Sequence, residues 1–392
     1  MFTKKYFLSG LIIFILLQLF YYVFLIAFHD IVPFNTYLYG TAFHYGNYSQ
    51  QHNTNFNLLN ALSAWDSQWY IRIAHAGYTS SQEVAAHAGK VFYDQYAYAF
   101  LPLYPLSIFF IDFFLHNTLA SAFILNNIIL IAIFFSSYYV ISKLYSHEIA
   151  MRTNFLLLFF PLSVFYRSYY AESLFLLLLI WFGYTLVKRD WLFTSLLLYL
   201  LCLTKDNGIF LYFPLLYVIF NDIRHKKMHI FKAVAVVLFP LLAYAYLFLY
   251  GILLMGNGMV WVTAHAYWGY KATIVQTIGK NFQTIFTFFS LPWHVYKPSK
   301  TEVIAFFVGL FLLYKSRKFL KPEHWYIIIG LCIVPLLVKN FTSYARYEIV
   351  VFPFFIYLAK VLKGIWYDIA VIISFILLLI VSLVFINWGW VE

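Results

Sequence analysis

Charged side chains are scarce in this sequence: Asp, Glu, Lys and Arg together make up only 10% of its 392 residues. Soluble globular domains carry about 25%, so this composition excludes a soluble globule of ordinary make-up. Cysteine is nearly absent, and Cys202 and Cys332 both lie inside apolar segments, which excludes a disulfide framework and a metal-spaced cysteine pair. The sequence also lacks a G-x-G-x-x-G pattern, a P-loop and a G-x-S-x-G pattern, so nothing supports a nucleotide cradle or a hydrolase nucleophile.

Apolar residues dominate instead, at 64% of the chain, with a mean hydropathy of +0.79. Repeated apolar runs near the length that crosses a bilayer predict an all-α, polytopic membrane protein. Aromatic residues reach 23%, which suits helix ends at the membrane boundary and the lining of a sugar-binding cavity. The net charge of +11 does not indicate a nucleic-acid partner, because the basic residues are scattered between apolar runs, where they orient the protein in the bilayer.

The apolar runs predict a single integral-membrane domain over residues 1–392, with about eleven spans. A run over 7–28 follows Lys4 and Lys5 and lacks a cleavage site, so we interpret it as the first span, with the N-terminus inside. A short apolar piece ending near Leu115 decides the rest: if it crossed, both dense basic clusters would lie outside, so we interpret it as a juxtamembrane helix. The predicted layout is then an external loop over 29–118 with juxtamembrane helices, spans 2–7 over 119–254, a second external loop over 255–300 and spans 8–11 over 301–392.

The longest polar segment contains the stretch 65–78, whose second residue is Asp66. Apolar residues in and just before this stretch are spaced by four, three, four and four positions, which predicts one amphipathic helix with Asp66 on the flank of its apolar stripe. Such a helix would hold a lone carboxylate at the membrane boundary. The alternative is an interfacial helix whose aspartate merely faces water. The stripe consists of Leu58, Leu62, Trp65, Trp69 and Ile73.

Further polar and charged residues are predicted at the outer ends of later helices and in the second external loop. Lys205 and Asp206 interrupt an apolar stretch, and ionisable residues at membrane depth are costly and usually face a cavity with a partner. Ordinary interfacial charges are the alternative. The histidines of the first external loop are not spaced as metal ligands, so no zinc site is expected. The set comprises Arg167, Glu172, Lys205, Asp206, Asn207, His265, Trp268 and Arg346.

Several short motifs follow one another in a fixed order: W-D-x-x-W-Y-x-x-I-A-x-x-G-Y at 65–78, F-L-P-L-Y-P-L at 100–106, Y-A-E-S-L-F at 170–175, T-K-D-N-G at 204–208, Trp268-Gly269, Arg346-Tyr347 and Phe352-Pro353. Together they resemble the signature of the PIG-V family, the second mannosyltransferase of GPI-anchor assembly and its prokaryotic relatives. The resemblance extends from about residue 60 to residue 355. Lys205, Asp206 and Ala171 stand where the family has arginine, serine and threonine.

The resemblance implies a GT-C-type glycosyltransferase fold and transfer of a sugar, mannose by the family's example, from a polyprenyl-phosphate donor. It implies that Asp66 is the general base; Arg346, Lys205 and Arg167 then suit the donor phosphate. The expected acceptor is a glycolipid, glycan or protein at the outer face of a prokaryotic plasma membrane. No cofactor and no particular protein partner is expected, and a divalent metal is left open. The residues expected to bind substrate are Trp65, Trp69, Tyr70, Arg72, Tyr104, Glu172, Asp206, Asn207, His265, Trp268 and Tyr347.

Two other classes of function stay open on the sequence alone. A transporter or flippase for a lipid-linked sugar would use the same aromatic cavity and charges without needing Asp66 as a base, although the lack of internal repeats argues against it. A purely structural membrane subunit would leave Lys205, Asp206 and Arg346 without an explanation. The aromatic residues of the motifs either stack on sugar faces or form an interfacial belt: Trp65, Trp69, Tyr104 and Trp268.

Overall fold

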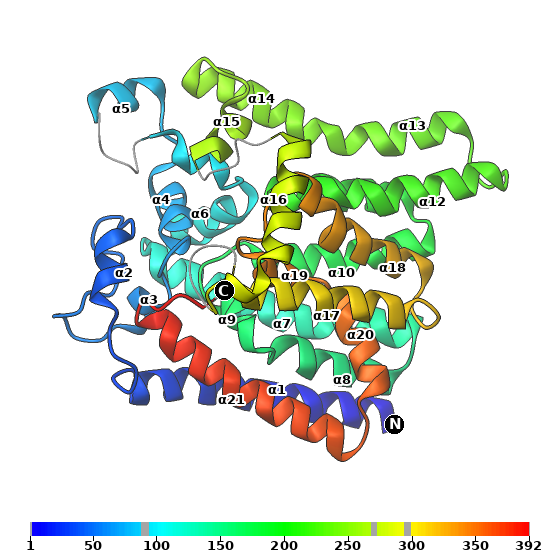
Figure 1. The fold of residues 1–392 in the computed structure, drawn as a ribbon, viewed down its shortest axis with the longest axis horizontal. Coiled ribbons are helices and arrows are strands. Elements are labelled where there is room, and N and C mark those ends of the chain that lie inside the picture. The colour runs from blue at the N-terminus through cyan, green and yellow to red at the C-terminus, as the bar shows by residue number, and fades with distance from the viewer. Residues whose placement is uncertain (1, 88–93, 268–272, 294–298, 392) are drawn as a thin grey trace.

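Most of the long helices run in similar directions and form the body of this computed structural model (Figure 1). The structure describes residues 2–87, 94–267, 273–293 and 299–391, and the regular elements in these ranges are all helical. In chain order they are α1 (Phe2–Phe28), α2 (Thr36–Thr41), α3 (Leu58–Ala61), α4 (Ser67–Ala76), α5 (Ser81–Ala86), η2 (Gln95–Ala99), α6 (Leu103–Leu115), α7 (Thr118–Leu144), α8 (His147–Leu158), η3 (Pro161–Ser163), α9 (Val164–Arg167), α10 (Glu172–Lys188), α11 (Trp191–Thr204), η4 (Asp206–Leu211), α12 (Tyr212–Arg224), α13 (Ile230–Leu238), η5 (Phe239–Leu241), α14 (Leu242–Met255), α15 (Val260–Tyr267), α16 (Ile274–Phe286), η6 (Phe288–Ser290), α17 (Lys300–Ser316), α18 (Pro322–Ile328), η7 (Ile329–Ile333), η8 (Val334–Leu337), α19 (Tyr344–Glu348), α20 (Phe352–Val361) and α21 (Ile365–Ile386).

Capping side chains fix the start of several helices. Asn117, Ser146 and Asp190 each accept a hydrogen bond from a backbone N–H in the first turn of α7, α8 and α11. Thr273 and Gln276 form a capping box at the start of α16. Because protein groups satisfy these amides, the apolar helices can begin at a membrane boundary without leaving the amides unpaired.

Four helices among the described residues are long and apolar enough to cross a membrane, and one bent pair of helices would make a fifth span. The chain is therefore a multi-pass membrane protein. Other segments that the sequence predicts as spans form shorter helices, so the count of eleven stays a prediction. The long helices are Lys5–Phe28, Thr118–Leu144, Ile230–Met255 and Ile365–Ile386; the shorter apolar ones are Leu103–Leu115, Trp191–Thr204, Pro322–Leu337 and Phe352–Val361.

The stretch 58–73 is not the single helix that its apolar spacing predicts. It forms α3 and α4, separated by a turn over residues 62–66 in which Trp65 has a left-handed backbone with a φ of 59°. The side-chain amide of Gln68 braces this turn by donating to the backbone oxygen of Ser63 at 2.6 Å. Periodicity cannot reveal such a break, because the apolar side chains of both short helices still face one core. The break places Asp66 at the N-cap of α4, not on the flank of a continuous helix.

The two ends of the molecule carry different elements (Figure 1). Helices α2 to α5 gather at the left-hand end, whereas the N-terminus and the α12–α13 turn lie at the right-hand end. Near the α12–α13 turn, Arg189 fastens the helix ends together: its guanidinium nitrogens lie 2.9 Å from an oxygen of Asp222 and 2.7 Å from one of Glu323. These three charges have partners within the protein, so their role is structural.

Arg167 fastens a sharp bend of 71° between α8 and the segment formed by η3 and α9. Its fully buried guanidinium donates to the backbone oxygens of Leu158 and Ser163, at 3.0 and 3.1 Å, and to the side chain of Gln18 in α1, at 3.0 Å. The ring of Tyr21 covers it, with 4.9 Å between the guanidinium carbon and the ring centroid. All of these partners are protein groups, so the contacts explain Arg167 as a residue that stabilises the bend.

We expect the Arg167→Ala variant to lose about 2–4 kcal/mol of unfolding free energy, because buried hydrogen bonds to a charged donor and the packing of a large side chain are both lost. The melting temperature of the purified protein in detergent measures this. Arg152→Ala is the matched control, since Arg152 pairs with the exposed Glu148 within α8 and such pairs contribute little. Equal, small shifts for the two variants would contradict the role given to Arg167.

Candidate functional site

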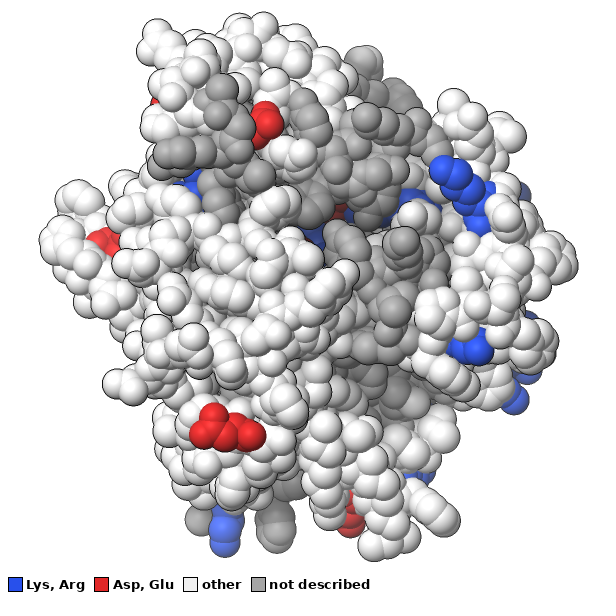
Figure 2. All heavy atoms as spheres, turned by 60° about the vertical axis from the view of Figure 1, so that its left-hand side comes forward, with Lys and Arg blue, Asp and Glu red and all other residues white. Residues whose placement is uncertain are grey.

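Few Lys, Arg, Asp or Glu side chains show on the surface at the left-hand end of the molecule as drawn in Figure 1. Figure 2 brings that end forward and shows a small group of blue and red atoms that lies recessed below the surrounding surface. In a chain with so few charged residues, ionisable groups that gather together call for partners or a ligand.

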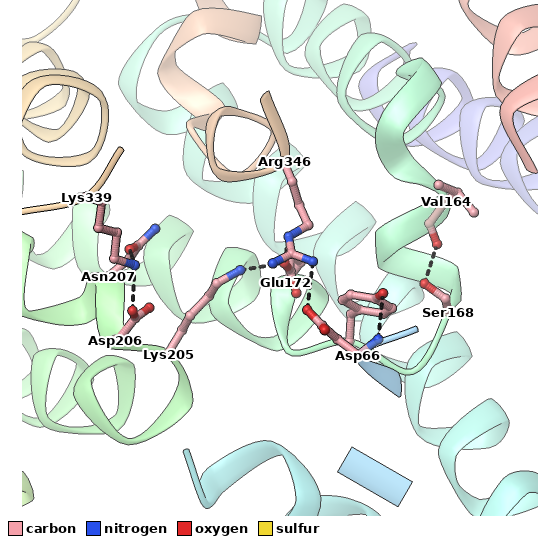
Figure 3. A network of polar contacts seen from close by, with 10 residues as sticks. Asp66, Val164, Ser168, Glu172, Lys205, Asp206, Asn207, Lys339 and Arg346 are labelled. Atoms are coloured by element: carbon pink, nitrogen blue, oxygen red, sulfur yellow. Dashed lines mark hydrogen bonds and ion pairs between the residues drawn. The ribbon is translucent and has the colours of Figure 1, made fainter. Parts of the chain in front are cut away.

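An ion pair joins two parts of the chain that are 280 positions apart: Nη1 of Arg346 in α19 lies 2.9 Å from Oδ2 of Asp66 (Figure 3). Asp66 occupies the N-cap position of α4, where an aspartate usually accepts hydrogen bonds from the helix amides, but its side chain makes none. Its backbone N–H donates to the hydroxyl of Tyr170 at 3.1 Å, which fixes the residue from the other side. The carboxylate of Asp66 is therefore held by a cation, and helix α4 does not use this carboxylate as a cap.

Glu172, at the start of α10, is the buried centre of this cluster, with 1% of its side chain exposed. Its Oε1 lies 3.3 Å from Nε of Arg346 and accepts a short hydrogen bond from the ammonium of Lys205, which follows α11 (Figure 3). A carboxylate buried this deeply is costly unless it is paired. The two cations offset that cost, and the N-terminus of α10 adds a favourable helix-dipole interaction.

A second group of polar residues surrounds Asp206, the first residue of η4 (Figure 3). The ammonium of Lys339 donates to Oδ2 of Asp206 and, at 2.9 Å, to Oδ1 of Asn207. Nε2 of His265, in α15, lies 3.4 Å from the same oxygen of Asp206. Burial alone would raise the pKa of Asp206, but Lys339 and His265 outweigh it and hold that pKa well below its usual range. Burial would also lower the pKa of His265, but its bond to Asp206 reverses this and raises it, so the imidazole protonates more readily.

The ring of Tyr347 links the two groups. The ammonium nitrogens of Lys205 and Lys339 lie 4.8 and 4.7 Å from its centroid, and the guanidinium carbon of Arg346 lies 5.6 Å from it. Cations at these distances are attracted to an aromatic face. Three cations therefore converge on one ring, and their charge is balanced by the carboxylates of Asp66, Glu172 and Asp206.

Exposure within the cluster is uneven. The side chains of Asp66 and Asp206 are 28% and 27% exposed, whereas those of Lys339 and Arg346 are only 9% and 10% exposed. The outer carboxylates can thus meet a ligand, while the cations behind them are largely shielded from water. Among the described residues, no group of three or more His, Cys, Asp or Glu side chains is placed to hold a metal ion.

The arrangement suits an anionic ligand bound beside a proton acceptor. The planar fork of Arg346 can bind two phosphate oxygens, and the ammonium groups of Lys205 and Lys339 can bind others. Asp66 can accept a proton from a hydroxyl group that lies next to the bound anion. A phosphate-containing substrate and a hydroxyl-bearing one could therefore meet at this cluster.

The cluster contains most of the ionisable residues predicted from the sequence. Tyr70, in α4, lies near it: burial raises the pKa of its hydroxyl well above the usual range, and the charges of Glu172 and Asp66 raise it further. The predicted residues that the structure brings together are Asp66, Glu172, Lys205, Asp206, Asn207, His265, Arg346 and Tyr347.

Two predicted cations lie elsewhere. Arg167 was expected to bind the donor phosphate, but the structure places it at the α8–α9 bend, bonded to protein groups. Arg72, expected to bind substrate, is fully buried; it donates to the backbone oxygen of Gly77 and, at 3.0 Å, to the hydroxyl of Thr79. In both cases protein acceptors offset part of the cost of burying a charge, and the sequence pattern does not distinguish this role from ligand binding.

Two predicted aromatic residues are also part of the core. Trp69 stacks on Phe100, with 5.6 Å between ring centroids, and Tyr104 donates its hydroxyl proton to the side chain of Asn126 at 2.8 Å. Both side chains are almost fully buried, so they pack within the protein and do not line the recess. Trp268 lies outside the described residues.

Lys339 and the C-terminal tryptophans are absent from the sequence-based site. Lys339 directly follows an apolar run, so the argument that singled out Lys205 could have found it. Trp388 and Trp390 contact Trp65, with 5.4 and 5.1 Å between ring centroids. No spacing rule connects residues so far apart in the chain, and only the fold reveals this contact.

The family model described as Mannosyltransferase (PIG-V) matches residues 3–280, while no curated protein and no solved structure matches the chain. The matched part contains Asp66, Glu172 and Lys205, and the fold adds Lys339 and Arg346 from beyond it. The family resemblance is thereby confirmed over residues 3–280, and the motifs at 346–347 and 352–353 lie beyond the match. Since the match covers more than half of the chain, this multi-pass membrane protein belongs to the PIG-V mannosyltransferase family of glycosyltransferases.

Proposed function

We propose that the protein transfers a mannosyl or other hexosyl group from a polyprenyl-phosphate donor to a glycolipid, glycan or protein acceptor, with a GT-C-type fold and inversion at the anomeric carbon. The observation that carries this proposal is the pairing of a part-exposed carboxylate, Asp66, with Arg346 at the edge of a cation cluster. Family membership supplies the reaction class. The geometry suggests a role for each residue.

The donor phosphate binds to Arg346, Lys205 and Lys339. In the structure these cations are paired with carboxylates, so an arriving phosphate exchanges one set of anionic partners for another. Little rearrangement of the cations is needed, because they are already gathered around Tyr347. Charge grows on the phosphate as its bond to the sugar breaks, and cations fixed in advance stabilise that transition state more than the ground state.

Asp66 accepts the proton of the acceptor hydroxyl. As Arg346 turns toward the phosphate, Asp66 loses its cationic partner and becomes a stronger base, so proton acceptance follows donor binding. The acceptor oxygen then bonds to the anomeric carbon from the face opposite the phosphate. The bond between that carbon and the phosphate oxygen breaks, its electron pair leaves with the phosphate, and the proton remains on Asp66.

The site lies at the outer face of the membrane in this proposal. The first external loop forms the end of the molecule that holds α2 to α5, and the N-terminus and the basic α12–α13 turn lie at the opposite end (Figure 1). Basic turns stay on the cytoplasmic side of most membrane proteins. This orientation agrees with the proposed layout of eleven spans, with external loops over 29–118 and 255–300.

Asp66→Asn should keep the shape of the side chain and remove its capacity to take a proton. We expect donor binding and melting temperature to stay close to wild type, while kcat falls by about 10²–10⁴-fold, the usual contribution of a positioned base. Purified protein and a synthetic polyprenyl-phosphate mannose provide the assay, and Asp368→Asn, in the exposed first turn of α21, is the control. A folded Asp66→Asn protein that transfers sugar at a near wild-type rate would remove Asp66 as the base. If the protein is a transporter, this substitution has no special chemical consequence.

Arg346→Lys should raise the donor KM and lower kcat together, because a single ammonium cannot hold two phosphate oxygens. We expect kcat/KM to fall by about 10–100-fold, the effect of losing a hydrogen bond to a charged group. Arg317→Lys, in the exposed turn between α17 and α18, is the matched control.

The two lysines of the cluster give a further prediction. We expect the Lys205→Ala and Lys339→Ala variants to bind the donor more weakly, measured as a higher donor KM, and the Lys205→Arg variant to bind it as wild type does. Unchanged donor affinity in both alanine variants would place the phosphate elsewhere.

The orientation can be tested with two exposed positions, because the native thiols of Cys202 and Cys332 are buried. We expect the Asn53→Cys variant to react in intact cells with a membrane-impermeant maleimide. The Lys226→Cys variant, in the α12–α13 turn, should react only after the membrane is permeabilised. The reverse pattern would overturn the proposed outer-face site.

A further inference from the structure

We propose that Trp65 and Trp390, supported by Trp388, form an aromatic platform that binds a pyranose ring of the acceptor beside Asp66. The inference rests on the proposed function and deepens it, because it assigns the acceptor side of the same site. The platform includes residues from the C-terminal segment, which lies outside the family match at residues 3–280.

The three indole rings form one cluster. The centroid of Trp65 lies 5.4 Å from that of Trp388 and 5.1 Å from that of Trp390, and the planes of Trp65 and Trp390 are perpendicular. Trp388 is fully buried and also contacts Tyr39 and His44, with centroid distances of 5.2 and 4.7 Å. Trp65 and Trp390 are half-buried and keep accessible surface, whereas Trp388 packs against Trp65 from inside the protein.

The end of α21 is shaped to deliver this segment to the site. Gly389 N–H donates to the oxygen of Val384 at 2.8 Å, and Trp388 N–H to that of Phe385 at 3.1 Å, which together form a Schellman motif. The residue in the left-handed position of this motif is usually glycine, but here it is Trp388, with a φ of 60°. A side chain at Gly389 would lie 2.3 Å from the side chain of Val384, so the chain can turn this closely only with glycine there.

The tail is tied to the first external loop. The side chain of Asn387 donates to the backbone oxygen of His29 at 2.8 Å, and its own backbone oxygen accepts from Asn35 N–H at 2.9 Å. Figure 1 shows the C-terminal segment leaving α21 and running toward the middle of the molecule, where α9 and α19 are labelled. The position of Trp390 is thus set by specific contacts on both sides of Trp388.

Among the described residues, the tryptophan cluster contains backbone strain and unpaired N–H groups, two unfavourable features that packing alone does not require. Trp65, immediately before Asp66, has a left-handed backbone like Trp388, which bulky residues rarely adopt. Within the described part of the chain, the indole N–H groups of Trp65 and Trp388 are buried without a hydrogen-bond acceptor. Phenylalanine would fill much of the same space without burying an N–H. Backbone strain of this kind concentrates at functional sites, where the surrounding structure maintains it.

The chemistry of the platform fits the acceptor and not the donor phosphate. On one side, Asp66 forms an ion pair with Arg346, which belongs to the cation cluster. On the other side, Trp65 precedes Asp66 in the chain and contacts Trp390. An uncharged aromatic surface suits the apolar face of an uncharged sugar ring and offers nothing to a phosphate. Because inversion requires the attacking hydroxyl and the leaving phosphate to lie on opposite faces of the transferred sugar, a separate acceptor surface next to the base is needed.

The test compares Trp390→Ala with Trp366→Ala, a matched control whose ring is 70% exposed near the other end of α21. The full-length purified proteins receive polyprenyl-phosphate mannose and, as acceptor probes, octyl mannoside, octyl glucoside and octyl galactoside. Donor hydrolysis without any probe is measured in parallel. We expect Trp390→Ala to raise the KM for the best probe by about tenfold, with the donor KM and donor hydrolysis within about twofold of wild type. Trp390→Phe should restore most of the acceptor affinity, and Trp366→Ala should change neither KM.

The outcomes separate this inference from the proposed function. A wild-type protein that consumes no donor refutes both. A protein that hydrolyses the donor but uses none of the pyranosides overturns the acceptor platform alone. The platform is also overturned if the acceptor KM of Trp390→Ala matches that of Trp366→Ala, which leaves an interfacial anchor, or if its donor KM rises as much as its acceptor KM.

Discussion

The ion pair between Asp66 and Arg346 links α4 to α19, two helices that lie far apart in the sequence. Arg346 also lies against Glu172, and Glu172 holds Lys205, so the charges form one continuous network across α4, α10 and α19. Glu172 is tolerated at its depth because both cations are present, since a buried charge that loses its partner costs about 3–5 kcal/mol. The same network that stabilises the resting protein therefore supplies the groups that a phosphate and a hydroxyl would use.

Composition and apolar runs predicted the helical membrane class correctly, and the order of short motifs predicted the family. The rule that ionisable residues at membrane depth need partners identified Glu172, Lys205 and Arg346, which the structure brings together. The same rule also selected Arg167, because a buried charge is costly whether its partner is a ligand or a backbone oxygen. The turn before Asp66 could not be predicted, since the apolar spacing continues unchanged across it.

The two parts of the chain contribute different chemistry to the site. The three carboxylates come from the part that the family model matches, whereas Lys339 and Arg346 come from beyond it, as do the tryptophans that contact Trp65. Asp66 thus lies at the start of a short helix near the beginning of the chain, whereas Lys339 and Arg346 lie in segments that are made much later. Lys339 and Arg346 both lie over the ring of Tyr347, so contacts in the folded protein bring these groups together with the carboxylates.

The separation of 280 positions between Asp66 and Arg346 has a consequence for biosynthesis. At about 5–20 residues per second, the arginine is made about 14–56 seconds after the aspartate. Once Glu172 has also been made, the nascent chain contains both carboxylates but not yet the cation that pairs with both of them. The charged cluster can therefore assemble only after α19 has been made, and a chain that stalls before that helix leaves the cluster incomplete in the membrane.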